Sequence, residues 1–410
     1  MALLPKFELT RPVESLVVRG VHERLGSLTR GELVLAERGE ERRFGAALTD
    51  DDPRVRIEVR DRAFWKSIAF RGSIGAAESW IRGEWHTDDL VGVIRLFARN
   101  FAANDALERG FARLSRPVLA AWHAVRSNTR SGSKRNISAH YDLSNEFFEL
   151  LLDESMTYSC ALYEREDQSL HEAQLAKLDR LCDLLRLGPD DHLLEIGTGW
   201  GALACHAARR HGCRVTTTTI SREQHEVAVR RVREAGLEGR AEVLLQDYRD
   251  LRGKYDKLVS VEMIEAVGHR FYGTFFAKCA ELLAEDGLMV MQAITIADRH
   301  YERARRSVDF IQRHVFPGSC IPSVTALLSA AAKESDLTPV ALHDITSSYV
   351  RTLGAWRENL HAESDRIRAL GFDERFLRLW DYYLAYSAGG FAERHIGDVH
   401  LALAKPRWQP

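Results

Sequence analysis

An apolar run leads directly into three alternating glycines in the stretch Leu193-Leu194-Glu195-Ile196-Gly197-Thr198-Gly199-Trp200-Gly201. The apolar residues predict a buried strand, and the pattern after Gly201 predicts a helix. Glycine reaches positive φ angles and lets a ligand approach the backbone N–H groups at a helix N-terminus. The stretch therefore predicts a strand, a ligand-binding loop and a helix, with a plain glycine-rich turn as the alternative.

The spacing of these glycines distinguishes two kinds of nucleotide-like ligand. Dinucleotide-binding folds favour G-x-G-x-x-G, with an acid about 20 residues later that binds the ribose. Here the spacing is G-x-G-x-G, and the corresponding later stretch, residues 216–219, contains only threonine. Glu195 also stands two residues before the first glycine. This combination favours the compact loop of an S-adenosylmethionine-dependent methyltransferase.

A carboxylate follows the strand that is predicted at residues 241–245. Asp247 lies two residues beyond this strand, where a carboxylate can accept a hydrogen bond from the amino group of adenine. A helix N-cap or a turn is the alternative role for an aspartate in this position.

Strands and helices alternate from about residue 140 onward. The strands are predicted at 192–196, 214–220, 241–245, 256–261 and 287–295, and the helices between them at 202–210, 222–235 and 270–284. Two later strands, at 339–345 and 399–403, bracket a long helical insert. Alternation of this kind predicts an α/β fold with a doubly wound, seven-stranded, mostly parallel sheet and an antiparallel edge strand.

The 410 residues leave room for two to three domains. Residues 126–139 combine four basic side chains with small polar breakers and contain no acid, which predicts an exposed linker. Residues 1–125 have short strand-like runs followed by helical runs, so we predict a small α+β domain there. Residues 140–410 form the predicted catalytic domain.

The overall composition is that of an ordinary globular protein. There are 57 Lys and Arg against 59 Asp and Glu, so the net charge of −2 gives no reason to expect nucleic acid. Six cysteines are scattered without metal-binding or redox spacing, which fits a reducing compartment. No secretory signal and no apolar run of about 18–20 residues is found. We therefore expect a cytoplasmic protein.

A basic segment offers a means of reaching a lipid surface. Between Arg109 and Arg135 there are seven Arg and Lys residues and no acid, with Phe111 and Trp122 among them. This pattern is typical of a basic amphipathic helix that lies on an anionic membrane. An interdomain helix with a solvated basic face is the alternative.

Several motifs together resemble those of the cyclopropane-fatty-acyl-phospholipid synthases and mycolic acid methyltransferases. From residue 140 to the C-terminus they follow one another in constant order, and a weaker resemblance covers residues 72–90. Besides the glycine loop, they are His140-Tyr141-Asp142-Leu143-Ser144-Asn145, Tyr158-Ser159-Cys160-Ala161, Thr219-Ile220-Ser221-Arg222-Glu223-Gln224, Gln246-Asp247-Tyr248-Arg249-Asp250, Glu262-Met263-Ile264-Glu265 and Phe316-Pro317-Gly318-Ser319-Cys320-Ile321-Pro322-Ser323.

The resemblance implies methyl transfer from S-adenosylmethionine to a cis double bond of a lipid acyl chain. The resulting carbocation loses a proton from the new methyl group to close a cyclopropane, and bound bicarbonate is the base. The implied bicarbonate site consists of Cys160, Glu265, Gln292, Ile294 and Tyr349. Cys160 and Ile294 would act through backbone groups, Tyr349 would donate its hydroxyl, and Glu265 would accept the bicarbonate O–H.

The resemblance also implies a cofactor site and partners. A phospholipid bilayer with unsaturated acyl chains would be the substrate, reached from the inner membrane face; a homodimer is allowed, and no metal is expected. The implied cofactor residues are Tyr158, Ser159, Glu195, Gly197, Thr198, Gly199, Gly201, Thr219, Ile220, Ser221, Gln224, Gln246, Asp247 and Tyr248.

The resemblance favours a cyclopropane synthase as the leading function, and three departures from the family pattern keep a branched product as the second. Gln292 stands where well-known members have histidine, Ala266 replaces a frequent histidine, and Ser387 replaces a frequent cysteine. An amide can hydrogen-bond an anion but cannot become cationic. The cation could therefore undergo a hydride shift instead of ring closure, giving a methylene- or methyl-branched chain. The sequence is also compatible with an N- or O-methyltransferase for small molecules and with an inactive lipid-binding protein.

Overall fold

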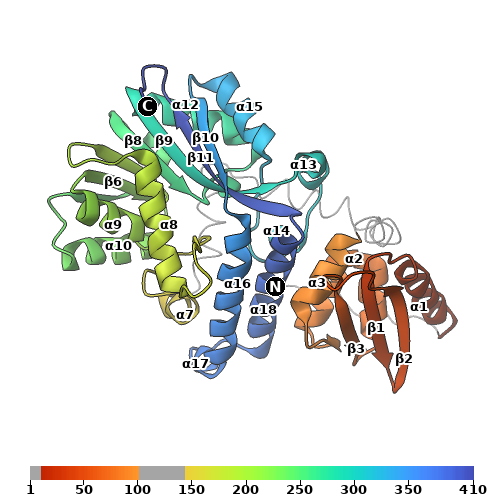
Figure 1. The fold of residues 1–410 in the computed structure, drawn as a ribbon. Coiled ribbons are helices and arrows are strands. Elements are labelled where there is room, and N and C mark those ends of the chain that lie inside the picture. Colours follow the sequence, from red (N-terminus) through yellow and green to blue (C-terminus); the bar gives the residue numbers. More distant parts are fainter. Residues whose placement is uncertain (1–10, 101–143) are drawn as a thin grey trace. The chain divides into compact units, whose positions relative to one another are not determined.

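The computed structural model describes residues 11–100 and 144–410 (Figure 1). The chain divides into two compact units, one formed by Met1–Ala121 with Asp373–Glu393 and the other by Trp122–Phe372 with Arg394–Pro410. The predicted catalytic domain included all of 140–410, whereas 373–393 groups with the N-terminal unit. The predicted linker at 126–139 and the basic segment from Arg109 to Arg135 lie outside the described residues.

The first unit combines a small sheet with helices, and helix α1 precedes the strands that were predicted to come first. Its sheet has the strand order β2-β1-β3-β4 among the described residues. Helix α18 belongs to this unit because it packs against α2 and α3; for example, the Trp80 indole N–H donates to the Arg378 carbonyl oxygen at 3.2 Å. The elements are α1 (Arg11–Leu25), β1 (Gly31–Glu37), β2 (Glu40–Ala46), β3 (Arg54–Val59), α2 (Ala63–Ile81), β4 (Trp85–His86), α3 (Leu90–Arg99) and α18 (Glu374–Ala392).

The second unit alternates strands and helices. The strands are β5 (His192–Ile196), β6 (Arg214–Thr219), β7 (Ala241–Leu245), β8 (Tyr255–Val261), β9 (Leu283–Ile296), β10 (Thr338–Asp344) and β11 (Ile396–Ala404). The helices are α7 (Asn145–Leu151), α8 (Leu170–Leu185), α9 (Ala202–His211), α10 (Arg222–Glu234), α11 (Ile264–Val267), α12 (Tyr272–Leu282), α13 (Asp298–Ala304), α14 (Phe310–His314), α15 (Val324–Glu334), α16 (Thr346–Ala362) and α17 (Ser364–Ala369), with 3₁₀ turns η2 (Tyr248–Asp250) and η3 (His269–Phe271).

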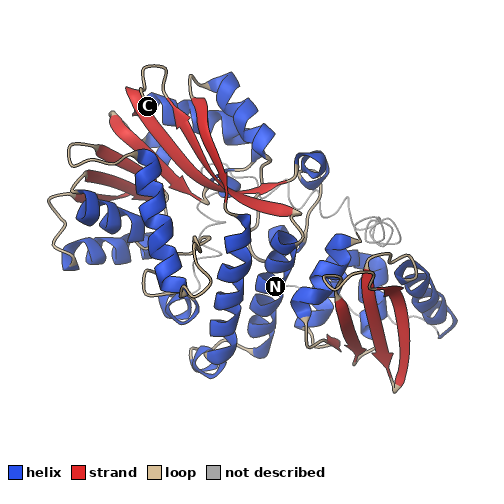
Figure 2. Cartoon of the chain, in the orientation of Figure 1, coloured by secondary structure: helices blue, strands red, loops and turns tan. Residues whose placement is uncertain are grey.

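The described part of this unit contains a seven-stranded sheet of order β10-β11-β9-β8-β5-β6-β7. Strands β9, β8, β5, β6 and β7 are parallel, and β11 runs antiparallel to both β9 and β10 near one edge. The predicted fold class, a doubly wound and mostly parallel sheet with an antiparallel strand at its edge, is confirmed. Figure 2 shows the helices lying on the faces of this sheet.

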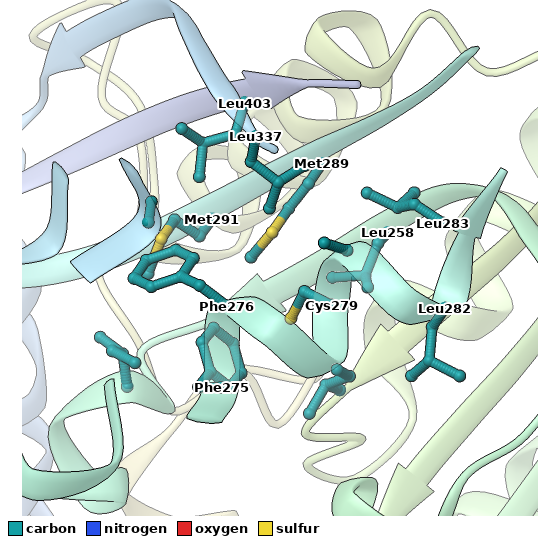
Figure 3. Packing of buried hydrophobic residues seen from close by; sticks show 14 of the residues in the cluster. Leu258, Phe275, Phe276, Cys279, Leu282, Leu283, Met289, Met291, Leu337 and Leu403 are labelled. Carbon is teal, nitrogen blue, oxygen red and sulfur yellow. The ribbon is translucent and has the colours of Figure 1, made fainter. Parts of the chain in front are cut away.

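Two apolar cores hold the layers together. Successive strand residues point to opposite faces, so Leu193 packs in the core beneath α8 and α9 while Leu194 packs in the core beneath α12 and α15. Figure 3 shows the second core, in which Phe276 and Cys279 of α12 face the Met289 side chain of β9. Both cores are built from strands in the middle of the sheet, so the carboxyl ends of these strands are fixed relative to one another.

The strand order reverses between β5 and β8. From β5 the chain moves to β6 and β7 on one side, and then returns to β8 and β9 on the other. Ligands of open α/β sheets bind beyond the carboxyl ends of the strands at such a switch point. The glycine loop follows β5, and the Glu262–Glu265 segment follows β8, so the two stand side by side there. Among the described residues, no helix is long and apolar enough to cross a membrane.

Candidate active site

The glycine loop has the backbone that its sequence predicts. Gly197, Gly199 and Gly201 have φ angles of 103°, 53° and 89°. A Cβ atom on Gly201 would lie 3.1 Å from the Ala228 side chain of α10, whereas one on Gly199 would meet nothing within 4 Å. Gly201 therefore allows α9 to begin close to α10, and Gly199 presents bare backbone to open space. This is the surface that the S-adenosylmethionine assignment requires.

Glu195 lies beneath the loop, buried in the sheet. Its Oε2 accepts a hydrogen bond from the Thr217 hydroxyl at 2.6 Å, and that hydroxyl oxygen also lies 2.7 Å from Thr198 Oγ1. Burial raises the pKa of Glu195 to about 8, despite the Thr217 hydrogen bond and the charge of Lys177. The carboxyl thus links β5, β6 and the start of the loop, and it is largely protonated at neutral pH.

The cofactor residues predicted after β6 form a helix cap. Ser221 is the N-cap of α10, and its hydroxyl accepts a hydrogen bond from the Gln224 N–H at 3.2 Å. The Thr219 hydroxyl donates to Gln224 Oε1 at 2.9 Å. The cap places Ile220 and the α10 N-terminus at the same sheet edge as the glycine loop.

The predicted cofactor residues after β7 lie next to this cap. The Gln246 N–H donates to the Thr219 carbonyl oxygen at 3.0 Å. Asp247 caps the 3₁₀ turn that contains Tyr248, and its Oδ2 pairs with the Arg249 guanidinium at 2.6 Å. The cap role that was the alternative for Asp247 is thus present in the structure. The Asp247 carboxylate lies just beyond the carboxyl end of β7.

Side chains of α8 hold the segment that carries Tyr158, Ser159 and Cys160. The Lys177 ammonium is fully buried and donates to Ser159 Oγ at 2.7 Å. The Gln174 amide donates to the Ser159 carbonyl oxygen at 2.9 Å. Burial raises the pKa of the Cys160 thiol well above its usual range, so this cysteine contributes its backbone rather than a thiolate.

The groups predicted to hold bicarbonate converge on the side chain of Glu262. Glu262 Oε1 accepts hydrogen bonds from the Cys160 N–H at 2.8 Å and from the Gln292 amide at 2.7 Å. Glu262 Oε2 accepts the Tyr349 hydroxyl at 2.6 Å. The donors come from a loop, from β9 and from α16, so the fold brings three distant segments to one carboxylate.

Glu265, one turn further along, engages the remaining member of the predicted set. Its Oε1 accepts a hydrogen bond from the Ile294 N–H at 2.6 Å, and its Oε2 is buried with no hydrogen-bond partner among residues 11–100 and 144–410. Burial and the neighbouring charge of Glu262 raise the pKa of Glu265 to about 8. The five predicted residues are thus brought together, but around two glutamates rather than one.

A third carboxyl completes what we call the carboxyl cluster: Glu262, Glu265 and Asp398. Asp398 of β11 is fully buried, and its Oδ2 accepts from the Gln292 amide at 3.0 Å. Burial and the charge of Glu262 raise the pKa of Asp398 well above its usual range. Burial also raises the pKa of Glu262, but the hydrogen bonds from Tyr349 and Cys160 and the charge of the buried Lys177 oppose that rise and favour its carboxylate form.

His400 fixes the orientation of the Gln292 amide. Its Nε2 lies 3.1 Å from Gln292 Oε1, and burial lowers the pKa of this histidine to about 3. A neutral imidazole can donate from Nε2, so the amide oxygen faces His400 and the amide nitrogen faces the carboxylates. Gln292 therefore has a defined donor role at the position where the family pattern has histidine.

Aromatic rings connect the carboxyl cluster with the glycine loop. Tyr349 and Trp356 lie with ring centroids 6.3 Å apart, and Trp356 and Tyr158 lie 5.2 Å apart. Tyr158 contacts Phe148 at 5.3 Å, and Phe148 contacts Trp200 of the loop at 4.9 Å. These contacts form a continuous row of aromatic rings, which we call the aromatic row, from Tyr349 of the site to Trp200 of the loop.

Sequence reasoning missed four residues of this site: Glu262, Asp398, Lys177 and His400. Glu262 stood in the quoted motif Glu262-Met263-Ile264-Glu265 and precedes its partner by three residues, which was an available signal. Asp398 and His400 flank Val399 on one strand, and a charged residue inside an apolar strand was a second signal. Nothing in the local sequence of α8 distinguished Lys177 from a surface lysine.

Comparison with known proteins agrees with the motifs. The family described as mycolic acid cyclopropane synthetase matches residues 128–401. The tuberculostearic acid methyltransferase UfaA1 of Mycobacterium tuberculosis is 38% identical over 366 residues, which are 87% of this chain and 84% of that protein. The cyclopropane-fatty-acyl-phospholipid synthase of Escherichia coli K12 is 35% identical over 357 residues, 86% of this chain and 88% of the synthase.

A solved structure matches about two thirds of the chain. The mycolic acid cyclopropane synthase CmaA1 in complex with S-adenosylhomocysteine (SAH) and CTAB is 31% identical, with a TM-score of 0.62 over 66% of this chain and 98% of that chain. The chain belongs to the mycolic acid cyclopropane synthetase family. It is an S-adenosylmethionine-dependent methyltransferase of a group that methylates or cyclopropanates lipid acyl chains.

Proposed function

We propose that this protein methylates a carbon of a cis double bond in an unsaturated phospholipid acyl chain and releases a methylene-branched chain. The observation that carries the proposal is the position of the carboxyl cluster beside the glycine loop. A Cβ atom on Gly197 would lie 3.5 Å from the Met263 side chain, so the loop and the Glu262–Glu265 segment are direct neighbours. A methyl donor and a proton acceptor are the two groups that this reaction needs.

The glycine loop fits S-adenosylmethionine, because Gly199 leaves the space that a side chain would fill. When bound, the cofactor supplies an electrophilic methyl group. The protein's own part is to orient the alkene, to exclude water, and to remove a proton from the cationic chain. The aromatic row from Tyr349 to Trp200 helps to exclude water, and the carboxyl cluster accepts the proton.

The fit of a separate bicarbonate ion is poor. Each donor assigned to it already has a carboxylate partner: Cys160, Gln292 and Tyr349 donate to Glu262, and the Ile294 N–H donates to Glu265. A second anion here would also face the negative charge of Glu262. We therefore route no step through bicarbonate.

A methylene branch follows from hydride shift and proton loss alone. A saturated methyl branch would need two further electrons, for which the reaction so described has no source. The similarity to a tuberculostearic acid methyltransferase and to a probable fatty acid methyltransferase, whose names specify methyl transfer and not ring formation, supports a branched product. The second candidate is the cyclopropane, which the similarity to the Escherichia coli synthase favours.

Expression in a bacterial host without its own synthase tests this function. Mass spectrometry of the phospholipids should find acyl chains that have gained one CH₂ unit, and proton NMR should detect vinylidene protons. Cyclopropane ring protons would favour the second candidate instead. Unchanged lipids, from a protein that binds S-adenosylmethionine in calorimetry, would refute acyl-chain methylation. Association with the inner face of the membrane is part of the proposal, and co-sedimentation with anionic vesicles tests it.

A further inference from the structure

We infer that the Glu262 carboxylate itself accepts the proton from the transferred methyl group, in place of a bound bicarbonate ion. This inference rests on the proposed function and deepens it. It makes Glu262, and not Glu265, the base of the reaction.

The hydrogen bonds have the arrangement expected for an anion site. A bicarbonate ion and a carboxylate share the same planar O–C–O group, so they accept hydrogen bonds in the same geometry. Here the donors are the Cys160 N–H, the Gln292 amide and the Tyr349 hydroxyl, at 2.8, 2.7 and 2.6 Å. All three converge on Glu262. The protein therefore carries its own carboxylate where its relatives are expected to bind one.

The backbone of Glu262 has a conformation that is unfavourable for glutamate, which indicates that the carboxylate has a function there. Its φ angle is 45°, in the left-handed region that disfavours side chains other than those of Gly, Asn and Asp. Its N–H donates to the Gln292 carbonyl oxygen at 2.9 Å, which holds this conformation at the end of β8. A strained backbone conformation that is kept just beyond the carboxyl end of a central strand is typical of a functional residue.

The two oxygen atoms of Glu262 differ in their freedom to accept a proton. Oε1 accepts two N–H groups that cannot turn away, from Cys160 and Gln292. Oε2 accepts the Tyr349 hydroxyl, which can rotate and act as an acceptor in turn. Burial raises the pKa of both glutamates, but Glu262 is partly exposed and its charged form is favoured by the Tyr349 and Cys160 hydrogen bonds and by Lys177. Glu265 is buried, and the charge of Glu262 raises its pKa further, to about 8. Oε2 of Glu262 is therefore the oxygen that can take up a proton.

The step balances without a co-reactant. A C–H bond of the transferred methyl group breaks, and its electron pair moves to the cationic carbon. That pair forms the second bond of the methylene group after a hydride shift, or the third ring bond of a cyclopropane. The proton goes to Glu262 Oε2, so a cation and a carboxylate become a neutral lipid and a neutral acid. Solvent receives the proton when the product leaves.

The test compares the wild type with Glu262→Gly and Glu262→Gln in buffer depleted of carbon dioxide and in buffer with added bicarbonate. Glycine tolerates the φ angle of 45° and opens the anion site, whereas glutamine fills it without a base. Turnover is measured with unsaturated phospholipid vesicles. Binding of ¹³C-labelled bicarbonate is measured independently by NMR line broadening, and calorimetry with S-adenosylmethionine checks that each variant is folded.

The wild type should lose less than about twofold of its turnover without bicarbonate and should show no saturable bicarbonate binding. The turnover of both variants should be lower than that of the wild type by roughly 10²–10⁴-fold, the usual contribution of a general base. Bicarbonate should bind to Glu262→Gly and restore part of its turnover, but should leave Glu262→Gln inactive. A wild type that needs bicarbonate, or a Glu262→Gln variant close to the wild type, would overturn the inference. If the wild type methylates no lipid in either buffer, the proposed function fails. The bicarbonate-binding measurement still tests the inference in that case, because saturable binding of bicarbonate by the wild type would overturn it.

Discussion

The glycine loop and the carboxyl cluster lie on either side of the switch point between β5 and β8, and they are built differently. The loop is made of backbone from one short segment, and its shape depends on the positive φ angles of Gly197, Gly199 and Gly201. The cluster is made of side chains from β11 and from the segment after β8. A backbone site is damaged by an added side chain, whereas a side-chain site is damaged by the loss of one atom or one charge.

The largest expected effect is on the loop. Gly199→Val should abolish S-adenosylmethionine binding in calorimetry, because the new side chain enters space that is open now and the φ angle of 53° strains a β-branched residue. Gly236→Val is the matched control, since Gly236 also has a positive φ, of 66°, and open space around it, in the turn after α10. Equal loss of binding in both variants would trace the effect to backbone strain and not to the loop.

The next largest effect tests the cluster through one hydrogen bond. Tyr349→Phe removes the hydroxyl that donates to Glu262 Oε2 at 2.6 Å. Loss of a hydrogen bond to a charged group costs about 1.5–3 kcal/mol, or roughly 10- to 100-fold in turnover.

The donor favours the charged form of Glu262, so its removal should raise the pKa of Glu262 and move the acid limb of the pH–rate profile to higher pH. Tyr255→Phe, at the other end of β8, is the control, because its hydroxyl hydrogen-bonds away from the carboxyl cluster, with the Arg252 carbonyl oxygen at 3.4 Å and with the Thr216 side chain. An unshifted acid limb in Tyr349→Phe would remove Glu262 from the pH dependence.

A smaller effect is expected at the second glutamate. Glu265→Gln keeps an oxygen that can accept the Ile294 N–H, and glutamine resembles the protonated acid that a pKa of about 8 implies at neutral pH. Turnover at pH 7 should fall by less than about tenfold, well short of a general-base contribution. The variant and the wild type should diverge as the pH passes the pKa of Glu265. A loss at pH 7 as large as that of Glu262→Gln would assign the base to Glu265.

The smallest effect concerns stability rather than activity. The pKa of Glu195 is raised from 4.5 to about 8 by burial, so between these values the folded protein holds a proton that the unfolded chain releases. The free energy of unfolding should therefore fall as the pH rises through this window, by about 1.4 kcal/mol per pH unit from this group. Urea titrations of Glu195→Gln should have a shallower fall than the wild type. Parallel pH dependences would mean that Glu195 is ionised in the folded state.

Local patterns predicted the fold and the loop well. The strands at 192–196 and 241–245 have the predicted bounds. The length of each strand is set by its own apolar run, and the glycine turn after the first is set by the glycines themselves, so both can be read from local sequence. Strand β9 begins at Leu283, four residues before its predicted start at 287, since pairing with a neighbour extends a strand beyond its apolar core. Helix α18 joins the N-terminal unit through contacts with residues about 300 positions earlier, such as Trp80 with Arg378, which no local pattern reveals.

The candidate site was predicted only in part. The motifs located Cys160, Gln292 and Tyr349, and the structure brings all three together. We predicted that a bound anion would be the shared partner of these three residues. No local sequence feature indicates that the Glu262 carboxylate lies between them. That placement depends on the left-handed backbone of Glu262 and on tertiary pairing of β8 with β9. Asp398 was missed for the same reason, since its environment comes from β9 and α16.

The most direct test of the central claim follows the hydrogen atoms of the transferred methyl group. The wild-type enzyme is incubated with unsaturated phospholipid and with S-adenosylmethionine that carries a trideuterated methyl group. The mass of the product acyl chain is then measured by mass spectrometry. If a base beside the glycine loop removes a proton from the transferred methyl group, the product should retain two deuterium atoms for each carbon transferred. Retention of all three would contradict this account, because the carboxyl cluster would then play no part in deprotonating the new carbon.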